Sequence, residues 1–293
     1  FLKLYISEIQ LGRHDINKNT MRNYQSVLTR LLEFRDFNNQ GDIKFEDISL
    51  DWYTEYFIWS KENELGITSF DKVIKIIKKI MRIALERELH HNTIYQHPEF
   101  KRQRKPKGDK VYLTIKEIEK VENLDLSTMA HLERERDRFL ISYYFMMRWG
   151  DSTSITESAI IEHCGLNYSY VANKTGIQCI VPISTKAKDL IERRGYNFDA
   201  DSNQKANQKI KEICMLAGIT QMAQQSGVKA PKYKFVTTHT ARRSAATNLY
   251  LEGMDLETIA RIGGWKKLET LKLYLRASGM EVAQNAKKFD FFK

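Results

Sequence analysis

Cysteine is scarce in this sequence of 293 residues, and the spacings that would organise a metal site or a disulfide framework are absent. The three cysteines, Cys164, Cys179 and Cys214, are odd in number and form no CxxC pair. A disulfide-rich secreted scaffold and a cysteine-based zinc site are therefore excluded. We expect reduced thiols that serve as small core residues of a cytoplasmic protein, with no metal and no cofactor.

Long hydrophobic runs and internal repeats are also missing. No stretch approaches the roughly 20 apolar residues that cross a bilayer, which excludes a membrane-spanning helix. The first ten residues carry Lys3 and Glu8 within their apolar pattern, so they do not resemble a signal peptide. Because the sequence begins with Phe1 rather than methionine, we expect a fragment or a trimmed chain.

Acidic residues are outnumbered by basic ones. There are 47 Lys and Arg against 37 Asp and Glu, which gives a net charge of +10 and a pI near 9.3. The excess is 18 against 15 in residues 1–105 and 29 against 22 in the remainder, so it is not confined to one tail. This balance favours a polyanionic partner, either nucleic acid or an anionic membrane surface.

The first hundred residues are predicted to be helical, because apolar residues recur at helical spacing over 20–34, 50–63 and 69–88. The third segment combines an apolar stripe with a basic row on another face, and no acidic residue interrupts that row. We predict that the row contacts DNA phosphates, with a solvated basic face as the alternative. The row consists of Lys72, Lys75, Lys79 and Arg82.

A basic segment over residues 101–110 separates this helical part from the rest. Six of its ten residues are basic, only Asp109 is acidic, and Pro106 and Gly108 interrupt any apolar period. We predict a linker that lies along a phosphate backbone, although basic linkers also exist for solubility alone. The candidate DNA contacts are Lys101, Arg102, Arg104 and Lys105.

The second part is predicted to be mostly helical with one small β-hairpin. Thr114 and Glu117 form the signature of a capping box. Alternating apolar residues on both sides of an Asn-Lys-Thr-Gly turn predict the hairpin. The strands are expected over 166–173 and 176–182, and the helices over 133–147, 185–193, 201–217, 239–252, 255–262 and 268–277.

Six positions in this part carry the side chains of a phosphoryl-transfer site. Two arginines suit the non-bridging oxygens of a phosphodiester and would stabilise its transition state without a metal. A tyrosine can attack phosphorus and store the bond as a phosphotyrosine, while a lysine at a hairpin tip can protonate the leaving 5′ oxygen. The six are Arg148, Lys174, His239, Arg242, Trp265 and Tyr274.

Five of these residues have an ordinary structural explanation when taken alone. Arg148 can be a surface residue at a helix end, Lys174 a solvated turn residue, and His239 a helix cap or a core histidine. Trp265 and Tyr274 can be core packing. The ordered combination of Arg, Lys, His-x-x-Arg, Trp and Tyr behind a basic linker is what favours the catalytic interpretation.

That combination resembles the tyrosine recombinase (phage integrase) family over nearly the whole chain. The resemblance implies a mainly α fold with a small β-hairpin or sheet. Residues 1–104 would form a helical, SAM-like core DNA-binding domain, 105–112 a basic linker, and 113–293 a mixed, mostly helical catalytic domain with a C-terminal tail.

The resemblance also implies a role for each residue. Arg148 and Arg242 would bind the scissile phosphate, His239 would assist proton movement, and Lys174 would be the general acid. Tyr274 would be the nucleophile. Trp265 stands where the family has His or Trp, and Asp151 matches an acidic position of structural use.

Two departures from the family pattern affect these assignments. Many members have Thr-Gly just before the first arginine's neighbour, where this chain has Phe145 and Met146. The match of Arg148 to the first phosphate-binding arginine is therefore less specific. An indole also cannot titrate, so acid–base work would not fall to the Trp position. The fallback arginines are Arg134, Arg136 and Arg138.

The expected function is that of a site-specific recombinase acting through a 3′-phosphotyrosyl intermediate, most like integrases of mobile elements and conjugative transposons. Family membership implies double-stranded DNA with inverted-repeat core sites, a homo-tetramer on two sites and possible accessory directionality factors. It implies a cytoplasmic, nucleoid-associated bacterial protein. Integrases of conjugative transposons often carry a further N-terminal arm-binding domain, so we expect a truncated chain. The alternatives are a DNA invertase or dimer-resolution recombinase, a type IB topoisomerase, a binding-only module, and a membrane-surface or RNA-binding protein.

Overall fold

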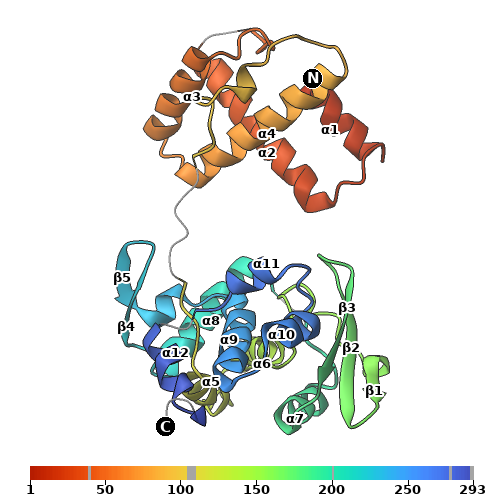
Figure 1. The fold of residues 1–293 in the computed structure, drawn as a ribbon, viewed down its shortest axis with the longest axis vertical. Coiled ribbons are helices and arrows are strands. Elements are labelled where there is room, and N and C mark those ends of the chain that lie inside the picture. Colours follow the sequence, from red (N-terminus) through yellow and green to blue (C-terminus); the bar gives the residue numbers. More distant parts are fainter. Residues whose placement is uncertain (39–40, 104–109, 200, 277–278, 291–293) are drawn as a thin grey trace. The chain divides into compact units, whose positions relative to one another are not determined.

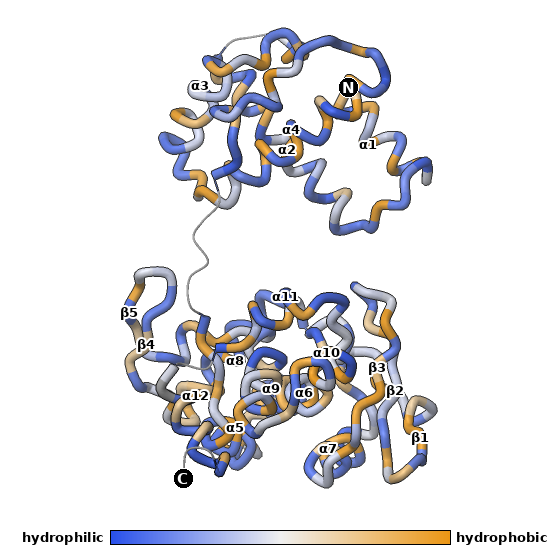
Figure 2. Tube along the Cα trace, in the orientation of Figure 1, coloured by the Kyte–Doolittle hydropathy of each residue, from blue (hydrophilic) through white to orange (hydrophobic). Residues whose placement is uncertain are grey.

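A computed structural model describes residues 1–38, 41–103, 110–199, 201–276 and 279–290. The chain divides into two compact units, Phe1–Pro106 and Lys107–Lys293 (Figure 1). Each unit buries an apolar core of its own. Along the helices of both units, hydrophobic and hydrophilic positions are interleaved (Figure 2), as expected for helices with one buried face. No helix of the described residues is long and apolar enough to span a membrane.

Unit 1 is built from helices around an aromatic core. Phe34 is 1% exposed and meets the rings of Trp52, Tyr56 and Trp59 edge to face, an arrangement that aromatic quadrupoles favour. The four α-helices and one 3-10 turn are α1 (Leu2–Gln10), α2 (Lys18–Phe37), α3 (Leu50–Glu62), α4 (Ile67–Glu86) and η1 (Ile94–Gln96).

An ion pair ties the first helix of unit 1 to the end of α4. The Arg87 guanidinium donates to both oxygens of Glu8 at 2.8 and 2.9 Å, and His14 lies 2.9 Å from the same carboxylate. These hydrogen bonds lower the pKa of Glu8 to about 2. The fork geometry fixes the direction of α1 as well as adding attraction.

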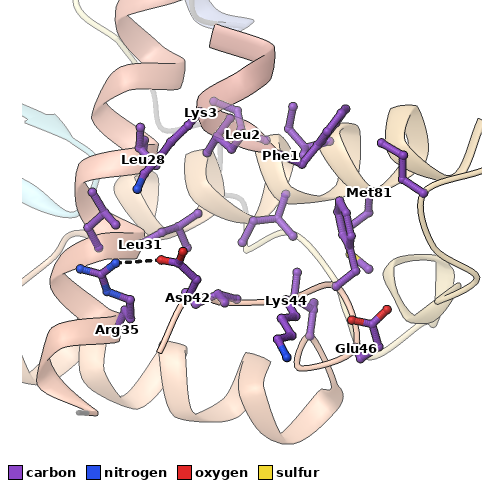
Figure 3. Close-up of a pocket in the computed structure, with 18 residues that line it drawn as sticks. Phe1, Leu2, Lys3, Leu28, Leu31, Arg35, Asp42, Lys44, Glu46 and Met81 are labelled. Carbon is purple, nitrogen blue, oxygen red and sulfur yellow. Dashed lines mark hydrogen bonds and ion pairs between the residues drawn. The ribbon is translucent and has the colours of Figure 1, made fainter. Parts of the chain in front are cut away.

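Unit 1 also contains an apolar hollow of about 430 Å³. Leu28, Leu31 and Met81 line it, and the ion pair between Arg35 and Asp42 lies among its lining residues (Figure 3). Most of its lining is apolar, and charged side chains such as Lys3, Lys44 and Glu46 also line it. The candidate catalytic side chains lie in unit 2.

Unit 2 is built from helices and short strands, and α9 packs against several of the other helices. Helix α9 packs against α6, α8, α10 and α12, and β3 packs against α10. The helices are α5 (Ile115–Glu122), α6 (Ala130–Tyr144), α7 (Thr185–Arg194), α8 (Asn203–Leu216), α9 (Thr238–Glu252), α10 (Leu256–Gly263), α11 (Leu268–Lys272) and α12 (Gly279–Ala286), with 3-10 turns η2 (Glu157–Ala159) and η3 (Lys232–Phe235).

The strands of unit 2 form two small antiparallel sheets. The three-stranded sheet has the order β1-β2-β3, and its central pair aligns Tyr170 with Cys179. The second sheet is a hairpin whose turn residues, Ser226 and Gly227, both have positive φ, as a two-residue I′ turn requires. The strands are β1 (Ile160–Glu162), β2 (Leu166–Ala172), β3 (Ile177–Pro182), β4 (Met222–Gln225) and β5 (Val228–Pro231).

The fold class expected from the sequence is confirmed: the chain is mainly helical with small antiparallel sheets. The capping box of Thr114 and Glu117 is present, and all three cysteines are free. Cys179 and Cys214 are buried as expected, but the expectation of a core position was wrong for Cys164, which is exposed. The expected helix over 268–277 was wrong in its second half, because α11 ends at Lys272. The expected helix over 133–147 ends at Tyr144, and the β4–β5 hairpin was not foreseen.

Candidate active site

Arg242 is the centre of the site. It lies one turn into α9, whose first residues are fixed by the capping box of Thr237 and Thr240. Its side chain is fully buried, donates to the Met146 carbonyl and donates to the Gly263 carbonyl at 2.6 Å. Burial, followed by the nearby charge of Arg148, lowers its pKa to about 10, so it stays charged at neutral pH.

The Gly-Gly-Trp segment at the end of α10 covers the guanidinium of Arg242. The Trp265 ring centre lies 3.6 Å from the Arg242 Cζ, and Trp265 is 6% exposed. A Cβ on Gly263 would come within 1.9 Å of that ring, and one on Gly264, whose φ is +67°, within 2.6 Å of the Cys179 sulfur. Both glycines are therefore required by close approach, and they let the indole lie on the arginine.

Arg148 reaches the same place from the loop after α6. Met146 turns this loop with a positive φ of 48°, and its carbonyl accepts from Arg242. Arg148 is mostly buried, with its Nη1 3.8 Å from the Asp151 Oδ2, and its charge lowers the pKa of Arg242. Met146 therefore has a left-handed backbone, which a residue with a side chain seldom adopts, at the position where the resemblance led us to expect glycine.

The alternative candidates for the first arginine, Arg134, Arg136 and Arg138, lie in other surroundings. Arg136 donates to Asp137 and to the Leu124 carbonyl, while Arg138 donates to Ser152 and to the Trp149 carbonyl. Arg134 is exposed on α6. These arrangements favour Arg148 as the arginine that accompanies Arg242.

The tip of the β2–β3 hairpin is joined to this site from two sides. The Asn173 N–H donates to the Asp151 Oδ1 at 3.2 Å, and the Thr175 hydroxyl donates to the Gly264 carbonyl at 3.4 Å. Lys174 lies between them, exposed, in the turn. Asp151 therefore contacts both the loop of Arg148 and the hairpin of Lys174. These two contacts are consistent with the structural role expected for it.

Tyr274 lies just beyond the end of α11 and is half-buried. Its ring meets the Trp265 ring edge to face, with centres 5.3 Å apart and planes at 78°. The Arg242 Cζ lies 5.9 Å from the Tyr274 ring centre. The expected nucleophile, the tryptophan and the second arginine thus form one contiguous stack.

His239 is exposed at the start of α9, one turn before Arg242. The surrounding protein, and then the charges of Arg243, Arg242, Lys110 and Lys174, lower its pKa. All four charges act in the same direction as desolvation, so the neutral imidazole is favoured. The free ring nitrogen of a neutral imidazole can accept a proton, although the same cations make His239 a weaker base than an ordinary histidine.

Arg243 was missed by the sequence reasoning. It is 6% exposed, donates to the Val111 carbonyl at 2.8 Å, and has its pKa lowered to about 10 by burial and then by Arg276. Its position directly after Arg242 was the available signal.

The basic residues expected to contact DNA differ in their surroundings. Lys72, Lys75 and Lys101 are exposed, and Lys79 lies 5.3 Å from the Tyr24 ring. Arg82 pairs with Glu86 at 3.3 Å, one turn beyond the segment free of acidic residues. The remaining three are Arg102, which forms a bidentate pair with Asp71 at 3.0 and 2.6 Å, and Arg104 and Lys105, which lie outside the described residues.

No cluster of His, Cys, Asp and Glu able to hold a metal ion occurs among the residues that the structure describes. The site instead gathers two buried guanidinium groups, an aromatic stack, a histidine and a lysine. Such a set can hold an anion with fixed cationic donors, present a phenol to it and exchange protons beside it.

The sequence is similar to curated proteins named tyrosine recombinase XerD. Tyrosine recombinase XerD of Staphylococcus aureus is 27% identical over 178 residues, which are 60% of this chain and 53% of that protein. The chain therefore spans about half the length of these relatives. XerD of Halalkalibacterium halodurans is 22% identical over 280 residues, covering 92% of this chain and 90% of that protein.

Solved structures share the fold. A lambda integrase dimer bound to a COC′ core site has a TM-score of 0.69 at 16% identity and covers 94% of each chain. The Tn1549 transposon integrase in complex with circular intermediate DNA has a TM-score of 0.66 at 14% identity and covers 97% of each chain.

Family profiles cover both units. The profile of the phage integrase SAM-like domain matches residues 1–102, and that of the phage integrase family matches residues 112–280. The second match alone spans more than half of the 293 residues. The chain belongs to the phage integrase family.

Proposed function

We propose that this protein is a site-specific DNA recombinase that cleaves and rejoins DNA through Tyr274. The observation that carries the proposal is the stack in which the Tyr274 ring meets Trp265 and Trp265 covers the buried, charged Arg242. The stack brings the Tyr274 ring close to this guanidinium, which would have to be uncovered and exchange a main-chain carbonyl for a phosphate oxygen when DNA binds. Family membership supports the same reaction.

The chemistry follows from the assigned roles. Arg148 and Arg242 hold the non-bridging oxygens of the scissile phosphate, and the Tyr274 phenol oxygen attacks phosphorus. The P–O5′ bond breaks, leaving a 3′-phosphotyrosyl bond. The phenol proton passes to neutral His239, and Lys174 supplies a proton to the departing 5′ oxygen.

The second half of the reaction reverses the first. A 5′ hydroxyl attacks the phosphotyrosine, releases Tyr274 and restores a phosphodiester, so no ATP is consumed. Trp265 donates only through its indole N–H and by packing, since an indole does not titrate. Because the two arginines already supply positive charge, the step is proposed to need no metal and no cofactor.

The DNA interface is proposed to involve both parts of the chain. Residues 1–104 would form the core-binding domain, 105–112 the linker and 113–293 the catalytic domain. The exposed cations Lys72, Lys75 and Lys101 would contact phosphates. Arg102 and Arg82 would have to exchange their carboxylate partners to do so.

The finer proposal is integration and excision of a bacterial mobile element by a tetramer on two inverted-repeat core sites. One structural neighbour is an integrase of the Tn1549 transposon, and another is a lambda integrase tetramer bound to a Holliday junction. Directionality factors and a cytoplasmic, nucleoid-associated location belong to this proposal. The second candidate is a DNA invertase or a dimer-resolution recombinase, which would use the same chemistry on other DNA sites.

The first prediction tests the nucleophile. Tyr274→Phe should retain DNA binding and lose the covalent protein–DNA adduct on a nicked suicide duplex, because only the attacking oxygen is removed. The measurement is adduct formation on a denaturing gel beside binding by mobility shift. Tyr250→Phe is the matched control, since Tyr250 is a partly buried tyrosine of the same apolar cluster. An adduct formed by the Tyr274→Phe variant would contradict the assignment.

A further inference from the structure

Thr247 connects the helix of Arg242 to the backbone on both sides of Tyr274. It lies in α9 and is fully buried. Its hydroxyl donates to the Tyr274 carbonyl at 3.4 Å and accepts from the Arg276 N–H at 3.2 Å. One side chain therefore bonds to the residue expected to attack and to the residue two positions later.

This use of a helical threonine is unusual. Ser and Thr hydroxyls within helices commonly bond back to the carbonyl four residues earlier. Ser244 on the same helix does so, donating to the Thr240 carbonyl at 2.7 Å while it accepts from the Leu113 N–H. The Thr247 hydroxyl instead spans 27 and 29 residues along the chain.

The segment that receives these bonds lies beyond the last residue of a helix. Helix α11 ends at Lys272, and after it the Tyr274 N–H and the Leu275 N–H both bond to the Leu271 carbonyl. Among the described residues, Thr247 provides the side-chain hydrogen bonds to the backbone of 274–276. The Thr247 hydroxyl therefore joins this backbone to α9, in addition to the local bonds to Leu271 and the packing of the Tyr274 ring on Trp265.

We propose that Thr247 is a positioning residue for the nucleophile, an inference that rests on the proposed function. Arg242 and Thr247 lie five positions apart on one helix, so α9 sets the place of the phosphate clamp and of the tyrosine backbone together. Trp265 supports the ring and Thr247 supports the main chain. Attack on phosphorus requires a narrow range of positions, and an error of about 1 Å costs roughly 100-fold in rate.

The test removes the hydroxyl while it keeps the shape. Thr247→Val should bind the suicide duplex as tightly as the unchanged protein and form the phosphotyrosyl adduct about 10- to 100-fold more slowly. Thr247→Ser, which keeps the hydroxyl, should restore most of the rate. Rates are measured in single turnover at saturating DNA and at a temperature where every variant is folded by circular dichroism.

The matched control is Ser244→Ala, which removes an equally buried hydroxyl from the same helix without touching Tyr274. It should lower thermal stability and leave the single-turnover rate near that of the unchanged protein. The inference is overturned if Thr247→Val reacts at the unchanged rate, or if Ser244→Ala and Thr247→Ser are slowed as much as Thr247→Val.

Hydrogen exchange separates this inference from the proposed function. In the full chain without DNA, Thr247→Val should speed exchange of the Arg276 amide, which loses its acceptor, and leave the Leu113 amide protected by Ser244. Unchanged exchange at Arg276 overturns the positioning role. If the unchanged protein forms no adduct on any duplex, the proposed function fails while this exchange result still decides whether Thr247 holds the segment.

Discussion

Arg242 explains why one buried side chain can organise residues from distant parts of the sequence. Its guanidinium bonds to carbonyls of the Met146 turn and of Gly263, and the Trp265 ring lies on its face. A lysine carries the same charge but cannot donate in two fixed directions while presenting a flat surface to an indole. The identity of the residue, and not its charge alone, therefore holds the loop after α6 against the end of α10.

His239 provides a prediction about pH. Its pKa is lowered below the ordinary value of about 6.5, so the folded state binds fewer protons than the unfolded state just below that pH. Its contribution to stability is therefore complete above about pH 6.5 and is lost as the pH falls toward the lowered folded pKa. Adduct formation should likewise stay level through pH 6.5 and decline only below it, if His239 must accept the phenol proton.

The measurement is the titration of the His239 imidazole by NMR in the free protein. Arg243→Gln should raise this pKa toward the ordinary value, because Arg243 is the largest single charge that lowers it. Arg261→Gln, at an exposed position of α10, should leave it unchanged. A midpoint at or above 6.5 in the unchanged protein would refute the assignment of a neutral histidine.

At the scale of elements, the turn after α6 is a place where a glycine variant should be more stable than an alanine variant, the reverse of their usual order. Met146 has a φ of +48°, is 2% exposed and offers its carbonyl to Arg242. Elsewhere Gly is less stable than Ala by about 0.5–1 kcal/mol. In the left-handed region Ala pays a steric cost of about 1–2 kcal/mol that Gly does not.

Both Met146→Ala and Met146→Gly should be destabilised, by about 2–5 kcal/mol for the lost apolar side chain. Met146→Gly should nevertheless be the more stable of the two, by about 1 kcal/mol or less after the entropy of glycine is included. Urea denaturation of both variants measures the difference. A less stable glycine variant would mean that the positive φ does not persist in solution.

Secondary-structure elements were predictable where the residues that specify them are neighbours in the sequence. The Thr114 cap and the β2–β3 hairpin follow from neighbouring residues. The end of α11 was not predictable, because the Leu271, Leu273 and Leu275 pattern continues past the last helical residue. There the chain leaves the helix while Thr247, remote in sequence, bonds to its backbone.

The candidate site was predictable in its residue types and less so in its connections. The candidate residues from Arg148 to Tyr274 could be identified because their order and spacing along the chain are visible in the sequence itself. The hydrogen bond from Asn173 to Asp151 and the ion pair of Arg102 with Asp71 join segments that only folding brings together. No periodicity in the sequence records such pairs, so they had to come from the structure.

At the scale of the whole molecule, each unit has its own set of buried residues. The aromatic core around Phe34 belongs to unit 1, whereas the stack of Arg242, Trp265 and Tyr274 lies in unit 2. Domains with separate cores can unfold in separate transitions. The proposed chemistry should therefore survive damage to the first core, while DNA affinity, which is proposed to involve both units, should not.

Phe34→Ala should test this division, since truncating a buried phenylalanine costs about 3–5 kcal/mol. Calorimetry of the full chain should show one transition moved to lower temperature and another left in place. Above the lowered transition, single-turnover adduct formation should persist at saturating DNA, with a weaker apparent affinity. A matched loss from the other core, Phe145→Ala, should move the second transition and abolish the adduct, because Phe145 packs in unit 2 directly before the Met146 turn. If Phe34→Ala shifts a single transition of the whole chain, the two cores unfold as one, and the separation of affinity from chemistry is wrong.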